Sequence, residues 1–135
     1  MRKIILMMLL VALSSNAMAQ NGRLFGMWEM VGEINGITVR ANPDTIESEG
    51  DTVKFWSMVD YRTSQSYNRS EFMSAKLQVS FDCKNVKVRI LAGHYYPMNW
   101  GYGAQINKDD IVSEWTSIFS KSKDELLYNY ACGKK

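Results

Sequence analysis

The sequence is poor in the residues that most catalytic and metal sites require. Its 135 residues include one histidine, two cysteines and two prolines. A single imidazole, His94, does not support a catalytic triad, and no serine stands in a Gly-x-Ser-x-Gly elbow. Two distant thiols and one histidine are also too few ligands for a zinc site. We therefore expect no enzyme and no bound metal or cofactor, and we interpret His94 as an ordinary strand residue.

Acidic residues that could act together occur in one short stretch, Asp109, Asp110 and Glu114. The stretch lacks the spaced loop of an EF-hand, which calcium sites of that class need. Paired carboxylates are also a feature of glycosidases, where they face each other across a cleft. We predict a solvated turn here, and neither a calcium site nor a catalytic pair.

Long hydrophobic runs are scarce, and the one present is N-terminal. It covers residues 4–13, about half the length that a membrane-spanning helix needs. Ala17-Met18-Ala19 follows, with the small-x-small pattern of a signal peptidase site. Residues 1–19 are predicted to be a secretory signal peptide, and residues 20–135 a single domain that is exported, periplasmic or secreted, and without a transmembrane segment. No cysteine that could be acylated follows the apolar run, so we expect no lipid anchor. Surface display would therefore lack the usual lipid attachment.

Neither sign of charge dominates the predicted mature chain. Arg2 and Lys3 belong to the signal peptide, and without them the sixteen basic residues fall to fourteen, which equals the number of acidic residues. Nucleic acids and anionic membranes attract proteins that present a basic face. A neutral chain with interspersed charges offers no such face, so we expect no nucleic-acid partner.

The two cysteines, Cys83 and Cys132, are predicted to form a disulfide, because an exported chain with an even number of cysteines usually pairs them. In the chain-entropy model a bridge that closes about 50 residues is worth about 4 kcal/mol. Redox-active cysteine pairs are normally closely spaced, so the role of this bridge would be structural.

Alternation of apolar and polar residues predicts antiparallel strands. Residues 28–34 and 37–40 flank Asn35-Gly36, the strongest short hairpin signal. Period-two alternation predicts further strands over residues 53–62, 75–83 and 86–90. The short link Lys84-Asn85 makes the last two strands antiparallel neighbours. Continued from Ile90, the alternation places Tyr96 inward.

The C-terminal segment changes to a helical period. Ser122 to Glu125 form a capping box, so a helix is predicted to begin at Lys123 and to end at Gly133. Its apolar stripe is Leu126, Leu127, Tyr130 and Ala131. Cys132 lies off that stripe, beside Tyr128, so a bridge to Cys83 would require the last turn to tilt or unwind.

These elements predict an α+β fold: a single antiparallel β-sheet of about five or six strands, with a short C-terminal helix packed on one face and tied to it by the disulfide. The predicted mature chain of 116 residues, the full 135 without the first 19, suits one domain.

Aromatic residues are concentrated in the stretch GHYYPMNWGYG, residues 93–103. Its candidate binding residues are Tyr95, Tyr96, Trp100 and Tyr102. One interpretation is that these rings are core residues at a strand end. The other follows from Pro97, which interrupts strand pairing and leaves large amphipathic rings on a loop, where tyrosine and tryptophan often contact partners.

An ordered set of residues extends over most of the chain. It comprises Asp44 and Ile46, Phe55-Trp56 with Asp60-Tyr61, Asp82-Cys83 with Arg89, Gly101 and Gly103, Trp115 with Ser122, and Ala131-Cys132. In this order the set resembles the surface-adhesin protein E family. Relatives tend to carry Pro-Gly-Ser just before the helix, where this chain has Ser120-Lys121-Ser122.

The resemblance implies an antiparallel sheet tied by a disulfide to a C-terminal helix on its concave face. It also implies the properties of the family's named member, a lipid-anchored surface protein that binds host extracellular-matrix and serum proteins and haem. The matching residues are packing and turn residues, so the resemblance implies no ligand-binding residue.

Two functional hypotheses follow. The first is an exported, non-catalytic binding module for host or envelope macromolecules. The second is a soluble periplasmic protein that binds a small hydrophobic ligand or supports the cell envelope. Exposure of Trp100 and Tyr102 on an open surface favours the first hypothesis, whereas their convergence on a cavity favours the second.

Overall fold

The computed structural model describes residues 27–133. The predicted signal peptide, residues 1–19, lies outside them. The elements are β1 Glu29–Ile34, β2 Ile37–Ala41, the 3-10 turn η1 Pro43–Thr45, β3 Glu47–Glu49, β4 Thr52–Tyr67, β5 Ser70–Asp82, β6 Lys87–Tyr96, the 3-10 turn η2 Asn99–Gly101, β7 Asn107–Asp109, β8 Thr116–Ser117 and the helix α2 Lys123–Cys132.

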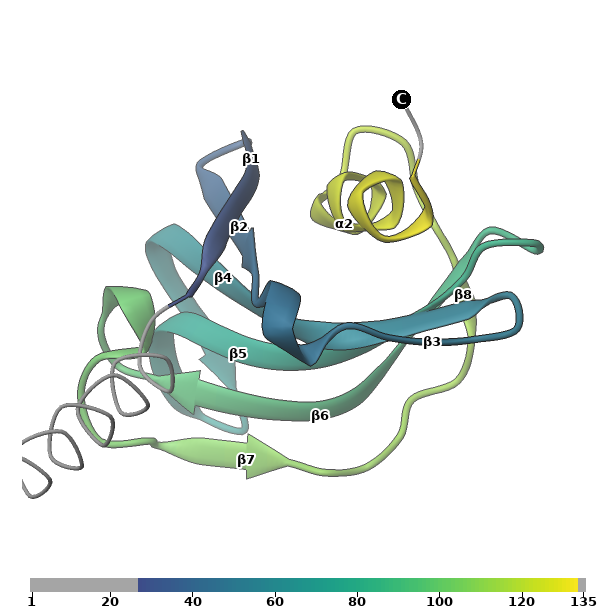
Figure 1. The fold of residues 1–135 in the computed structure, drawn as a ribbon. Coiled ribbons are helices and arrows are strands. Elements are labelled where there is room, and N and C mark those ends of the chain that lie inside the picture. The colour runs from purple at the N-terminus through teal and green to yellow at the C-terminus, as the bar shows by residue number, and fades with distance from the viewer. Residues whose placement is uncertain (1–26, 134–135) are drawn as a thin grey trace, which may run out of the picture.

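All the strands belong to one antiparallel sheet with the order β1-β2-β4-β5-β6-β7. Two more short strands extend it, since β3 pairs with β4 and β8 with β6. Figure 1 shows the sheet curling at the β1–β2 hairpin and the helix α2 lying on the inside of the curl. The predicted fold is confirmed, with more strands than expected: β3, β7 and β8 have two or three residues each, too few to show a period of two.

The predicted N-terminal hairpin is confirmed, and its turn explains why the sequence signal is reliable. Asn35 and Gly36 both adopt positive φ, 51° and 77°, the conformation that a tight two-residue turn requires. Earlier in β1, Gly32 lets the helix approach, because a Cβ at this position would lie 3.2 Å from the methyl carbons of Leu126.

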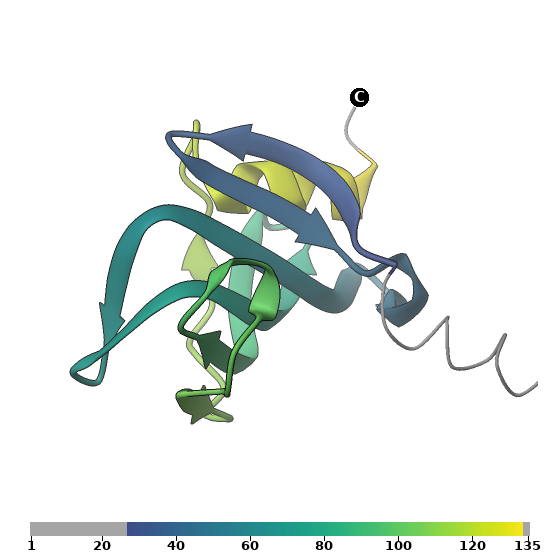
Figure 2. The same ribbon diagram turned by 90° about the vertical axis from the view of Figure 1, so that its left-hand side faces the viewer.

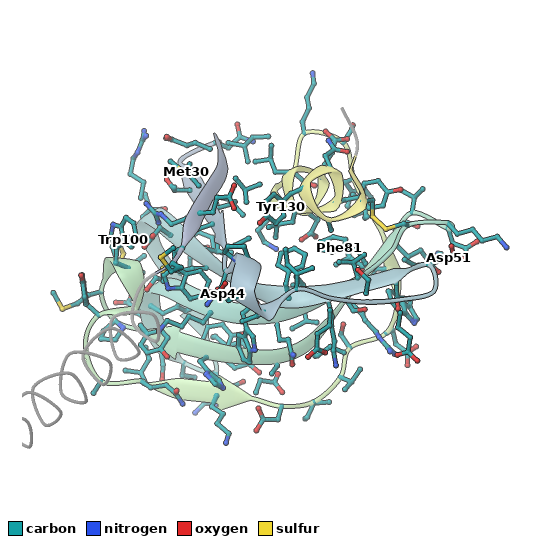
Figure 3. All side chains as sticks on the ribbon, viewed as in Figure 1. Met30, Asp44, Asp51, Phe81, Trp100 and Tyr130 are labelled. Atoms are coloured by element: carbon teal, nitrogen blue, oxygen red, sulfur yellow. A yellow bond between two sulfur atoms is a disulfide. The ribbon has the colours of Figure 1, made fainter. Side chains whose placement is uncertain are left out.

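The core lies between the concave face of the sheet and α2. Figure 3 shows Phe81, from β5, and Tyr130, from α2, in this layer. The buried residues that form the core are Val39, Ala41, Phe55, Val59, Phe72, Ala75, Leu77, Val79, Phe81, Val88, Leu127 and Tyr128. Most of them come from the faces of the central strands that alternation marks as apolar.

The helix α2 begins and ends where the sequence predicts. The Ser122 side chain accepts a hydrogen bond from the Glu125 amide at 3.2 Å, and Gly133 ends the helix with φ 67°. The predicted apolar stripe is only partly correct, because Tyr128 is buried beside Leu127, whereas Leu126, Tyr130 and Ala131 are only partly buried.

The disulfide between Cys83 and Cys132 is present, and it does not unwind the helix. Their Cα atoms lie 5.6 Å apart while Cys132 is still helical. Of the two alternatives expected, unwinding is not needed, because the side of α2 that carries Tyr128 faces the sheet. The Tyr128 hydroxyl donates to the carbonyl of Cys83 at 3.0 Å, so both residues fasten the helix to the end of β5.

The prediction that Tyr96 points inward is wrong, because the strand β6 contains a bulge. Val79 pairs with Ile90 but the next residue along, Gln78, pairs with Ala92, which leaves Leu91 as an extra residue. A bulge of one residue reverses the faces of everything beyond it. Tyr95 therefore takes the core side and Tyr96 the opposite side.

The turn before β6 is longer than predicted. The side chain of Asp82 accepts from the amides of Lys84 and Asn85 at 3.0 Å each, which stabilises the turn. Val86, predicted to begin the strand, lies in this turn with φ 56° and is exposed.

Candidate functional site

The four candidate binding residues lie in three different environments. Tyr95 is a packing residue, because its ring stacks on Tyr67 with centroids 4.4 Å apart and contacts the core residue Phe72. Tyr96, on the opposite face, lies 5.1 Å from the Lys76 ammonium. Only Trp100 and Tyr102 lie on the exposed loop, with 46% and 66% of their surfaces accessible. The stretch 93–103 is thus part scaffold and part exposed surface.

The loop that carries Trp100 covers the face of the sheet opposite to the helix. Figure 2 shows this loop in green, with η2, in front of the curled sheet. A Cβ on Gly101 would lie 2.8 Å from Cε of Lys76 and 3.8 Å from Cε of Met58, so the loop backbone contacts both side chains. Met58 lies on the face of β4 opposite to the core, yet it is buried because the loop lies over it.

Polar side chains of β4 and β5 fix the loop in place. The Asp60 carboxylate accepts from the Trp100 amide at 2.6 Å and from the Asn99 side chain at 3.2 Å. The Ser74 hydroxyl donates to the Met98 carbonyl at 2.5 Å and accepts from the Gly101 amide at 2.9 Å. These bonds hold both ends of η2, so the loop has a defined conformation.

Asp60 also forms a buried ion pair with Arg40 of β2. The guanidinium carbon of Arg40 lies 3.4 Å from the centroid of the Trp100 ring, a cation–π contact. Arg40, from β2, therefore contacts both the Asp60 carboxylate of β4 and the exposed ring of Trp100. The sequence analysis did not identify Arg40 or Asp60 as site residues, because the loop that Asp60 holds lies about forty residues further along the chain.

The backbone of Trp100 is unusual for a bulky residue, with φ 63° and ψ 22°. Left-handed conformations at non-glycine residues cost about 1–3 kcal/mol, and they persist where the surroundings impose them and often mark functional sites. Here the hydrogen bond that the Trp100 amide donates to Asp60 and the contact of the ring with Arg40 impose this conformation. The result is a large aromatic ring held half-exposed. Figure 3 shows Trp100 at one end of the sheet.

An open groove of about 400 Å³ borders the Trp100 ring. Its lining residues are Glu33, Gly36, Thr38, Arg40, Asp60, Tyr61, Arg62, Asn99 and Trp100. The charges within it are paired, since Arg62 lies 3.3 Å from Glu33 and Arg40 contacts Asp60. The groove is therefore polar without a net charge. We call this groove and the exposed side chains of Met98, Trp100 and Tyr102 the Trp100 surface.

A second polar cluster has a structural role at the edge of the sheet. The Tyr67 hydroxyl donates to the Asp109 carboxylate at 2.5 Å, which links β4 to β7. This hydrogen bond is the main cause that raises the pKa of Tyr67 to about 12, and it lowers the pKa of Asp109. Burial raises the pKa of Tyr61, in the aromatic cluster nearby, to about 12.

The His94 ring packs against Trp56 in a tilted arrangement with centroids 5.2 Å apart, in keeping with its interpretation as an ordinary strand residue. Within residues 27–133, no group of three or more histidine, cysteine or acidic side chains is arranged to hold a metal ion. Of the helices that the structure describes, none has both the length and the apolar character to cross a membrane.

The described chain is thus a curved antiparallel sheet with a disulfide-tethered helix and an anchored aromatic loop on the opposite face. The chain belongs to the surface-adhesin protein E family, whose model matches residues 28–133. A comparison with curated proteins found no match.

Among solved structures, the chain is similar to protein E of Haemophilus influenzae. One structure of that protein is 13% identical with a TM-score of 0.57, over 78% of this chain and 83% of that one. A second crystal form is 15% identical with a TM-score of 0.58, over 78% and 87% of the two chains. A selenomethionine form is 12% identical with a TM-score of 0.53, over 80% and 94%. The TM-scores show a shared fold, and at identities this low the likeness shows the fold alone.

Proposed function

We propose that this protein is an exported, non-catalytic binding module that recognises a macromolecule through the Trp100 surface. The observation that carries the proposal is Trp100 itself: a bulky residue in a strained backbone conformation, held half-exposed by a buried ion pair. A ring needed only for packing would gain more free energy by burial, so this arrangement favours a partner.

The chemistry of the loop supports a macromolecular partner. Met98, Trp100 and Tyr102 are all exposed on one short segment, and aromatic residues of this kind dominate the free energy of protein interfaces. The groove beside them is open and carries four charged side chains, which suits a small hydrophobic ligand poorly. The geometry therefore favours the binding module over the periplasmic carrier of a small hydrophobic ligand.

The family name, surface adhesin, favours host extracellular-matrix or serum proteins as partners. The predicted signal peptide supports export, and the absence of a cysteine after its apolar run leaves periplasmic and surface locations to be separated by experiment. No nucleic-acid partner is proposed, because the predicted mature chain is electrically neutral.

Location is tested first, by treating intact cells with protease and then fractionating them. Loss of the protein while periplasmic markers survive would support the adhesin role. Full protection, with release by osmotic shock, would contradict surface adhesion and favour an envelope partner.

Binding is tested with immobilised matrix and serum proteins. We expect Tyr102→Ser to weaken capture by about tenfold or more, because an interface aromatic residue contributes on that scale. Phe119→Ser is the matched control, since Phe119 is at least as exposed as Tyr102 but lies just before the helix, outside the Trp100 surface. Equal capture by both variants would show that the Trp100 surface is not the contact.

A further inference from the structure

We propose that the groove beside Trp100 binds a neutral saccharide. The inference rests on the proposed function and names the chemistry that the Trp100 surface would recognise. It depends on three features of the groove: a flat aromatic platform, a ring of hydrogen-bonding groups and the absence of net charge.

The platform is the indole of Trp100. Arg40 covers one face of the ring at 3.4 Å, yet 46% of the residue is exposed, so part of the ring stays open to a ligand. A pyranose ring has an apolar face of C–H groups, whose slightly positive hydrogens complement the negative face of an aromatic ring. Because the backbone of Trp100 is held by Asp60, the platform is ordered before a ligand arrives.

The groups around the platform can both donate and accept hydrogen bonds. Each sugar hydroxyl is a donor and an acceptor, so it pairs well with planar side chains that supply one role each. The groove offers carboxylate oxygens from Glu33, guanidinium N–H groups from Arg62 and a hydroxyl from Thr38. Arg62 and Glu33 are more than half exposed, so they can adjust to a ligand without leaving a buried group unpaired.

The pairing of the charges disfavours the main alternatives, which are anionic ligands. Both arginines of the groove have a carboxylate partner, Arg40 with Asp60 and Arg62 with Glu33, so no cation is left over for a phosphate, a sulfate or a polyanion. The Arg40 pair is also buried, and separating it would leave an uncompensated charge. A neutral, polyhydroxylated ligand fits a groove of this kind. The volume of the groove, about 400 Å³, is in the range of small-ligand sites.

Such a saccharide could come from an envelope glycan or from a host glycoprotein, and two probes separate these sources. N,N′,N″-triacetylchitotriose represents N-acetylated envelope glycans, and N-acetyllactosamine represents host glycoproteins. Each is titrated into residues 20–135 with the disulfide intact, and amide and indole N–H signals are followed by NMR. We expect saturable shifts at Trp100 and its neighbours, with one probe binding more tightly than the other and so identifying the source.

Three variants make the test specific. Trp100→Gly removes the platform but keeps a backbone that glycine adopts without strain, so we expect saccharide affinity to fall about tenfold or more while the protein stays folded. Trp100→Phe retains an aromatic face and should restore part of the affinity. Phe119→Ala, an exposed ring elsewhere, should bind as the natural chain does.

The proposal is wrong if neither saccharide gives saturable shifts, if Trp100→Gly binds as well as the natural chain, or if heparin binds the groove more tightly than both neutral probes. Its failure is distinguishable from that of the proposed function. Capture by a matrix or serum protein that depends on Trp100, without saccharide binding, would overturn only the saccharide inference. If neither saccharide binding nor Trp100-dependent capture of a protein is found, both the saccharide inference and the proposed function are overturned.

Discussion

Replacing Asp60 with alanine should destabilise the protein strongly, because one carboxylate holds three structural groups. It pairs with the buried guanidinium of Arg40, and it accepts hydrogen bonds from the Asn99 side chain and the Trp100 amide. Removing one partner of a buried pair costs about 3–5 kcal/mol, since the other charge is left uncompensated. A domain of this size has about 5–15 kcal/mol of stability, so the variant should still fold.

The assay is urea unfolding followed by tryptophan fluorescence. With a slope of about 1–3 kcal/mol per molar urea, the midpoint should fall by about 2 M. Glu33→Ala is the matched control, because its pair with Arg62 is exposed at 3.3 Å and should contribute about 1 kcal/mol or less. The double variant Arg40→Met with Asp60→Leu removes both charges and should lose less stability than Asp60→Ala alone.

Two results would refute this reasoning. If Asp60→Ala costs no more than Glu33→Ala, the carboxylate does not organise the loop. If the double variant is less stable than the single one, the loss comes from the missing hydrogen bonds and not from the buried charge of Arg40. Either result would also weaken the argument that Trp100 is held in place before binding.

Two further predictions concern the covalent tether and pH. The protein unfolded without reductant should show no free thiols, and Cys83→Ser with Cys132→Ser should lower the free energy of unfolding by about 4 kcal/mol; two reactive thiols would contradict the tether. Because the pKa of Asp109 lies below its ordinary 3.8, the stability that its bond to Tyr67 contributes is present above that pH and is lost as pH falls through the lower value. The raised pKa of Tyr61 acts at alkaline pH: the stability linked to it is fully present below pH 10 and is lost as pH rises to about 12. Tyr61→Phe should therefore reduce the loss of stability between these pH values, as measured by urea unfolding. An unchanged loss would contradict this assignment.

The sequence by itself determined the features that depend on neighbouring residues. The Asn35-Gly36 turn, the Ser122 cap and the Gly133 stop were predictable because each is specified by the φ preference or hydrogen bonding of a few adjacent residues. The disulfide was predictable by counting, because two cysteines allow one pairing. The apolar faces of β4 and β5 followed from a period of two, and together these features predicted the class of fold.

Only the tertiary structure decided how the faces and the loop are arranged. Because of the bulge at Leu91, Tyr95 and not Tyr96 lies on the core side. No local sequence signal marks a single extra residue in a strand. The rotation of α2 that buries Tyr128 depends on the shape of the curled sheet. Asp60 and Trp100 lie about forty residues apart, so their contact, and with it the candidate site, depends on where the chain returns after β6. Alternation predicts which side of a strand a residue faces, but only long-range packing decides what covers that side.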